Sequence, residues 1–377
     1  MGIRNSRFNI ERKPSSSDDK SVYGFQTLWD SDSIQSALNQ NPSNNSLPNF
    51  VLSKVELHPS GYCNLSCANC YGKNLSPEIS ERKGFPRGLM GKLFSNIRKK
   101  MPEENPLIVL SGLYSEPTIN PDFNNALNQL GEHHFRFGIY THGLHLCDEL
   151  VESMVDSASK SESEKPSYVS INVSASLIVD RFRKELLPKI EMICTKRNQM
   201  LTYQEKKFEI NAPIIVQHNF GYDLLFSVLN NLRELGVDNI RLSLPWEPHQ
   251  LERKTGYSGI SSGDFNKNLE LIQRLEIDFP GLRTRLPENS ISFEKCNVMA
   301  MSLAISPEGD VYPCPEKCSP EYRERFSYGN VNESELSEIW RNAKQRKLYD
   351  SLDPKKENCT CCPIHGEFNR FCVSLEK

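Results

Sequence analysis

The stretch FVLSKVELHPSGYCNLSCANCYG, residues 50–72, joins an apolar, β-like segment to three closely spaced cysteines. These cysteines, Cys63, Cys67 and Cys70, follow the spacing C-x3-C-x2-C. Metal sites built from cysteine usually have four protein ligands, whereas a site that reacts keeps one coordination position open. The stretch offers three thiolates and no fourth. It therefore predicts a strand that leads into a metal-binding loop with an open position.

Strand and helix signals alternate along most of the chain. Apolar runs typical of buried strands are separated by amphipathic segments with apolar residues on one helical face. The expected strands are residues 50–58, 106–112, 135–143, 167–175, 208–217 and 238–245. Six strand–helix units predict an α/β fold with a parallel sheet curled into a partial barrel, since a closed barrel needs eight. In such folds the chemistry lies at the carboxyl ends of the strands, where the cysteine loop is expected.

Composition restricts the class of protein and its partners. The 377 residues carry 45 basic and 48 acidic side chains, and this balance gives no reason to expect nucleic-acid binding. No apolar run approaches the ~20 residues of a membrane-spanning helix, and the N-terminus lacks the apolar core of a secretory signal. We expect a cytoplasmic protein without a membrane partner. Residues 1–49 are rich in Ser, Asn and Asp, and we expect them to form a mobile N-terminal arm.

The twelve cysteines gather mainly in the first loop and in residues 296–372. A disulfide framework suits small secreted domains, so two metal-binding regions in a reducing compartment are the expectation. In the first loop, zinc, or completion by a distant histidine, is an alternative to an iron–sulfur cluster. In the second region the alternative is a zinc ribbon built from Cys314, Cys318, Cys359 and Cys362.

The segment CNLSCANCY after the first strand resembles the signature of the radical S-adenosylmethionine (SAM) superfamily. The resemblance implies a partial (β/α)6 barrel over residues 50–285, in which Cys63, Cys67 and Cys70 hold a [4Fe–4S] cluster. It also implies that SAM occupies the open iron position. An external one-electron donor, such as flavodoxin or ferredoxin, would then reduce the cluster.

Other segments resemble the cofactor-binding elements of the same superfamily. LSGLYSEPTINPDF resembles its Gly-Gly-Glu-Pro segment, which implies that Glu116 receives the methionine ammonium, with a charge at a helix N-terminus as the alternative role. SINVSAS resembles its fourth strand, which implies ribose contacts from Asn172 and Ser174 on one strand face. Arg183 is the candidate for the methionine carboxylate, with Arg181 and Lys184 as alternatives. IYTHG resembles the third-strand Thr-Asn-Gly, with His142 where Asn is usual.

The segment from Cys296 through Gly309 to Cys314 resembles the auxiliary-cluster domain of many radical SAM enzymes, in its SPASM or shorter twitch form. We assign this domain to residues 286–377 and expect a β-hairpin turn around Gly309. The resemblance implies one auxiliary [4Fe–4S] cluster, for which we choose Cys296, Cys314, Cys359 and Cys362. A second auxiliary cluster would use Cys318, Cys361 and Cys372.

The resemblance implies an enzyme that cleaves SAM reductively and takes a hydrogen atom from its substrate through the 5′-deoxyadenosyl radical. The strand-end loops offer His142, His218, Trp246 and Glu247 as substrate contacts. The polar N-terminal arm is too short for the recognition domain of peptide-modifying relatives, which favours a small-molecule substrate in a biosynthetic pathway over a peptide. Oxidation, epimerisation, cross-linking and group transfer stay open as outcomes. A non-catalytic iron–sulfur or zinc protein is the alternative from another class.

Overall fold

The computed structural model of the protein describes residues 50–65, 67, 84–112, 115–178, 180–200, 207–217, 219–244, 262–285, 295–357 and 359. The predicted N-terminal arm and seven candidate site residues lie outside these ranges: Cys70, His218, Trp246, Glu247, Cys361, Cys362 and Cys372. Within the described ranges, no helix combines the length and the apolar character needed to cross a membrane.

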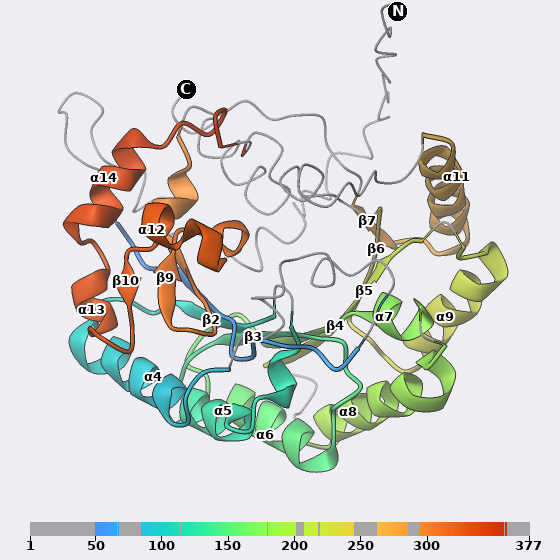
Figure 1. Cartoon of the computed structure of the whole chain (residues 1–377). Helices are drawn as coiled ribbons and strands as arrows, with labels where there is room; N and C mark the ends of the chain where they lie inside the picture. The colour runs from blue at the N-terminus through green and yellow to red at the C-terminus, as the bar shows by residue number, and fades with distance from the viewer. Residues whose placement is uncertain are drawn as a thin grey trace, which may run out of the picture.

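A parallel sheet forms the centre of the fold (Figure 1). Its first seven strands are β1 (Lys54–Leu57), β2 (Leu107–Leu110), β3 (Phe137–Thr141), β4 (Ser167–Ile171), β5 (Phe208–Ile215), β6 (Asn239–Ser243) and β7 (Arg283–Arg285). Each strand pairs in parallel with the next, so the six predicted strands are confirmed and β7 is an addition. Among the described strands the edges β10 and β7 do not pair, and the sheet is open, as expected for a partial barrel.

Helices cover the outer, convex side of this sheet (Figure 1). They are α4 (Leu89–Lys100), α5 (Phe123–Glu132), α6 (Asp148–Ser159), α8 (Leu187–Met200), α9 (Tyr222–Glu234) and α11 (Ser262–Asp278). The predicted apolar face of α4 is buried through Leu93, Phe94 and Ile97. These side chains share one core with Val55 and Leu57 of β1. Because successive strand residues point to opposite faces, the intervening residues of β1 point to the inner side of the sheet.

The C-terminal part extends the same sheet. β8 (Ser302–Ile305) pairs in parallel with β1, and β9 (Asp310–Tyr312) and β10 (Gly329–Asn330) continue in antiparallel order. The predicted hairpin turn joins β8 to β9, where Gly309 has a φ of 88° that suits glycine. This arrangement places β8, the strand that follows Cys296, beside the strand that leads into the cysteine loop.

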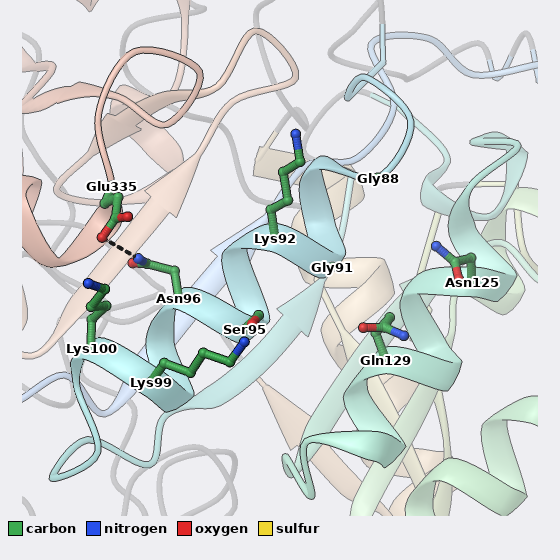
Figure 2. A pocket seen from close by; sticks show the side chains of 10 residues that line it. All are labelled: Gly88, Gly91, Lys92, Ser95, Asn96, Lys99, Lys100, Asn125, Gln129 and Glu335. Carbon is green, nitrogen blue, oxygen red and sulfur yellow. Dashed lines mark hydrogen bonds between the residues drawn. The ribbon is translucent and has the colours of Figure 1, made fainter.

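Two short helices of the C-terminal part, α13 (Leu336–Ile339) and α14 (Ala343–Ser351), pack on the outer core, whereas Phe326 of α12 (Arg323–Phe326) packs with Ala304 and Tyr312. Arg341 donates to Glu104 Oε1 (2.6 Å) and to the carbonyl oxygen of Phe50. Asn96 Nδ2 donates to Glu335 Oε2 (2.8 Å) beside a surface groove of about 480 Å³ between α4 and α5 (Figure 2). No predicted site residue lines this groove, so it lies apart from the candidate site.

The segment after β4 differs from the prediction. The sequence predicts a strand over 167–175, but β4 ends at Ile171 and is followed by α7 (Val173–Ile178). The helical run breaks at Asp180, whose φ is 52°, and resumes with the π-helical turn η3 (Phe182–Leu186). Pro188 is the second residue of α8, and proline is tolerated in the first turn of a helix.

Candidate functional site

Several ionisable side chains lie close together on the inner side of β1, the strand that leads into the cysteine loop. Lys54 Nζ donates to Glu56 Oε2 (3.0 Å), and Ser111 Oγ, just after β2, donates to Glu56 Oε1 (2.8 Å). The same hydroxyl lies 3.3 Å from His58 Nδ1, and His58 is only 3% exposed. The alternation of Lys54, Glu56 and His58 along the strand is what turns all three toward the inner side.

Opposing effects set the pKa of Glu56. Burial alone would raise it, but the nearby Lys54 ammonium, His58 and the hydroxyl of Ser111 outweigh burial and lower the pKa from 4.5 to about 2. The carboxylate is therefore ionised throughout the physiological range. Residues Lys54 and Glu56 were not among the predicted site residues, although their period of two on an otherwise apolar strand is the signal that could have indicated them.

Replacing Glu56 by Gln is expected to lower the free energy of unfolding by about 3 kcal/mol at pH 7, since each pKa unit corresponds to about 1.4 kcal/mol. Because the folded-state pKa of Glu56 is depressed, its contribution is present above pH 4.5 and is lost as the pH falls toward about 2. Urea unfolding between pH 7 and pH 3 checks this. The exposed Glu164→Gln variant is the matched control, and a pH-independent gap between wild type and Glu56→Gln would contradict the prediction.

The cysteine loop follows β1 at its carboxyl end, as predicted. Cys63 and Cys67 are half-buried, and the Leu65 N–H donates to Cys63 Sγ (3.4 Å). The segment after β2 holds the cysteine loop in place, since the backbone N–H of Glu116 donates to the carbonyl oxygen of Tyr62 (3.1 Å). Thiols at a strand end with a backbone donor aimed at sulfur suit an iron–sulfur cluster, whose sulfurs accept such bonds. The third predicted ligand, Cys70, lies outside the described residues.

Glu116 is 2% exposed and its carboxylate is surrounded by donors of this chain. Its Oε1 accepts from Thr118 N (3.2 Å), Thr118 Oγ1 (2.6 Å) and Thr141 Oγ1 (2.6 Å). Its Oε2 accepts from His142 N (2.9 Å). The sequence also predicts, as the alternative role, that Glu116 is a charge at a helix N-terminus. This role is confirmed, because Glu116 is the N-cap of the 3₁₀-helix Pro117–Ile119. The predicted contact with the methionine ammonium stays a prediction.

His142 joins the end of β3 to the cysteine loop. Its Nε2 lies 3.0 Å from Asn64 Oδ1, and its Nδ1 accepts the N–H of Leu144 (3.0 Å). Burial lowers the pKa of His142, and Glu116 opposes that shift. Three predicted elements, the cysteine loop, Glu116 and His142, therefore meet at one place. Asn64 and Thr141 take part there and were not predicted as site residues, although Asn64 belongs to the quoted CNLSCANCY motif.

The other predicted cofactor contacts lie further along the sheet. Asn172 links β4 to α7, and its buried Oδ1 accepts no hydrogen bond within the described part of the chain. Ser174 lies on α7, so it does not share a strand face with Asn172, and its Oγ accepts the N–H of Ile215 (2.5 Å). Arg183 is exposed and donates to Ser227 Oγ (3.2 Å) on α9. Their roles toward a cofactor remain predictions.

Among the described C-terminal cysteines, Cys314 and Cys318 flank the turn η5 (Pro315–Lys317), and Cys296 precedes β8. Burial, Cys314 and Cys296 together raise the pKa of the Tyr328 hydroxyl, which places both thiols near it. Nζ of the buried Lys317 lies 3.5 Å from Glu357 Oε2. Glu357 stands two residues before Cys359. Cys296, Cys314 and Cys359 thus approach one region. Cys318 packs instead in an apolar cluster with Ala304, Tyr312 and Phe326.

The thiols of this region fit an iron–sulfur cluster in their chemistry. In the described part of the chain, no three His, Cys, Asp or Glu side chains are arranged to hold a metal ion. None of the described cysteines forms a disulfide.

The η5 turn also faces β1. Burial raises the pKa of Glu316 to about 7, Lys317 opposes this rise, and the charge of Glu56 adds to it. The two cysteine regions therefore lie on either side of the charged inner face of β1.

Comparisons with known proteins agree with this arrangement. Residues 296–363 match the SPASM family, an iron-sulfur cluster-binding domain. Over 307 residues the chain is 25% identical to the tungsten-containing aldehyde ferredoxin oxidoreductase cofactor-modifying protein of Pyrococcus furiosus, covering 74% of this chain and 78% of that protein. The SPASM match begins at Cys296 and includes Cys314, Cys359 and Cys362, but not Cys372.

Two solved structures share the fold. Streptococcus suis SuiB bound to S-adenosylmethionine superposes with a TM-score of 0.55 at 16% identity, covering 85% of this chain and 72% of SuiB. The anSMEcpe structure with bound AdoMet has a TM-score of 0.50 at 16% identity, covering 84% of this chain and 85% of anSMEcpe. At these identities the likeness concerns the fold, which is the open parallel sheet with its C-terminal extension.

Proposed function

Since the chain is a radical SAM protein in motif and fold and carries a SPASM iron–sulfur cluster-binding domain, we propose that it removes a hydrogen atom from a small-molecule substrate in a biosynthetic reaction. Its cofactors are [4Fe–4S] clusters and SAM. When bound, these cofactors supply the hydrogen-abstracting radical. The observation that carries the proposal is the cysteine loop at the carboxyl end of β1, tied to the ends of β2 and β3 through Glu116 and His142.

The protein's own residues bind and orient in this scheme. Cys63, Cys67 and Cys70 would hold the SAM-binding cluster, and Cys296, Cys314, Cys359 and Cys362 an auxiliary one. The inner face of β1 is polar and buried, and Lys54 and Glu56 there can orient a polar substrate while the sheet excludes water. A protein of reduced thiols that needs an external electron donor suits a cytoplasmic setting.

The relative from Pyrococcus furiosus supports a small molecule, since its name describes a cofactor-modifying protein. A peptide substrate is the second candidate, because a SuiB structure bound to its precursor peptide SuiA also shares the fold, with a TM-score of 0.54. That likeness is at 16% identity and bears on architecture, so it supports the peptide less than the relative supports a small molecule.

Anaerobically reconstituted and reduced protein is expected to convert SAM to 5′-deoxyadenosine and methionine. Extract from the source organism grown in deuterated medium, separated into small-molecule and peptide fractions, then tests the substrate class. Because the abstracted atom is retained in 5′-deoxyadenosine, we expect mass spectrometry to find deuterium in it with the small-molecule fraction.

Two outcomes contradict the proposal in different ways. Deuterium transfer from the peptide fraction alone would favour the peptide-modifying alternative. Absence of 5′-deoxyadenosine, with both clusters present by iron analysis, would favour a non-catalytic iron–sulfur protein.

A further inference from the structure

Asn64 lies between the first two cysteines of the loop, and its side chain is held by a histidine from β3. His142 Nδ1 accepts the N–H of Leu144 (3.0 Å), so that nitrogen carries no proton. In the neutral ring the proton is therefore on Nε2, which donates to Asn64 Oδ1 (3.0 Å). Burial lowers the pKa of His142 and so favours this neutral form. The tautomer follows from the backbone contact alone.

Glu116 contacts the same histidine through its backbone and its ring. Its Oε2 accepts the backbone N–H of His142 (2.9 Å). The same oxygen lies 3.4 Å from the ring nitrogen Nε2 of His142. Its Oε1 already accepts three donors from Thr118 and Thr141. Each carboxylate oxygen offers about two acceptor positions, so donors of this chain fill Oε1, whereas Oε2 accepts one hydrogen bond and keeps a second position. Glu116 can thus act on the cysteine loop through His142.

We propose that Glu116 and His142 are positioning residues that set the conformation of the cysteine loop by holding Asn64 between Cys63 and Cys67. The inference rests on the proposed function, because it assigns these residues to the loop that binds the SAM-ligating cluster. Groups that orient metal ligands commonly alter affinity or activity about ten- to a hundredfold when they are removed. In this chain the hydrogen-bond donor to Asn64 is an imidazole nitrogen, which reaches further from the backbone than an asparagine amide.

Two substitutions of His142 separate its two hydrogen bonds. His142→Gln can place an amide nitrogen near the position of imidazole Nε2 and keep the donor to Asn64. His142→Asn can place an amide oxygen near the position of Nδ1 and keep only the contact with Leu144. We expect the SAM dissociation constant of reconstituted protein to rise about tenfold in His142→Asn and to stay near the wild-type value in His142→Gln. The SAM-induced change in the electron paramagnetic resonance spectrum of the reduced cluster should follow the same order.

A double-mutant cycle adds a second test. Asn64→Ala should weaken SAM binding as much as His142→Asn, and the combined variant should show no further loss, because both changes remove one contact. His145→Asn is the matched control, since its exposed ring lies 5.5 Å from that of His142, tilted by 43°, and is not part of the contact with Asn64. Iron content and thermal midpoint are measured for every variant.

Three outcomes would overturn the inference: wild-type SAM affinity in Asn64→Ala, additive losses in the combined variant, or equal losses in His142→Gln and His142→Asn. The wild-type protein is measured in the same assays. If wild-type protein with its cluster intact did not bind SAM, the proposed function itself would be wrong. The two failures are therefore distinguishable.

Discussion

Replacing Cys63, Cys67 and Cys70 together by alanine is expected to abolish the formation of 5′-deoxyadenosine from SAM and to remove about four irons per chain. Cys63 and Cys67 lie in one loop at the carboxyl end of β1, next to the contacts of Glu116 and His142. Without thiolates the loop cannot hold a cluster, and without the open iron position SAM has no site at which to accept an electron. The loss should be complete.

Iron analysis and chromatographic detection of 5′-deoxyadenosine check this expectation on the same anaerobic preparations. Cys147→Ala is the matched control, because Cys147 is an exposed cysteine at the start of α6, remote in sequence from both cysteine regions. It should leave iron content and product formation unchanged. Product from the triple variant would show that SAM is cleaved at another site, and the assignment of the loop would then be wrong.

The wild-type protein should contain about eight irons per chain, and replacing Cys314 and Cys359 by serine should leave about four. Cys314 and Cys296 both lie near the Tyr328 hydroxyl, and Cys359 follows Glu357, which pairs with Lys317 on η5. The SPASM match over residues 296–363 spans all four chosen ligands. The double variant therefore loses the auxiliary cluster while the loop after β1 keeps its own.

The Cys318→Ala variant is the control, because Cys318 packs against Tyr312 and Phe326 and is not among the four chosen ligands. It should retain about eight irons. A wild-type content of about twelve irons would mean that Cys318, Cys361 and Cys372 help to build a third cluster. About four irons with one zinc in the wild type would contradict an auxiliary iron–sulfur cluster altogether.

The parallel sheet was predictable because its strands are short apolar runs buried on the outer face, as Val55 and Leu57 illustrate. The segment 167–175 was misread in part: Ser167–Ile171 form β4, but Val173 and Ser174 begin a helix. Ser and Val are compatible with either state, and the contact of Ser174 Oγ with the N–H of Ile215 is tertiary. The local sequence pattern around Ser174 does not contain this contact with Ile215.

The cysteine loop was predictable from spacing, because cluster ligation requires thiolates at short intervals. The contacts that hold the loop were not, since Asn64 and His142 are 78 residues apart. The alternation of Lys54 and Glu56 is visible in the sequence, but the contact of Glu56 with Ser111, which is 55 residues away, is not. Single residues on an inner strand face acquire a role only when the sheet brings their partners to them.

The pairing of β1 with β8 has a consequence for how the chain is made. Lys54 pairs with Ser302, so β1 lacks its neighbour on one side until 248 further residues have been synthesised. At roughly 5–20 residues per second on the ribosome, that interval lasts about 12–50 s. During it the strand that carries the cysteine loop is an unpaired edge, a state that favours pairing with other chains. The contacts of the cysteine loop with Glu116 and His142 need only the first 142 residues, so they can form while this edge of β1 is still unpaired.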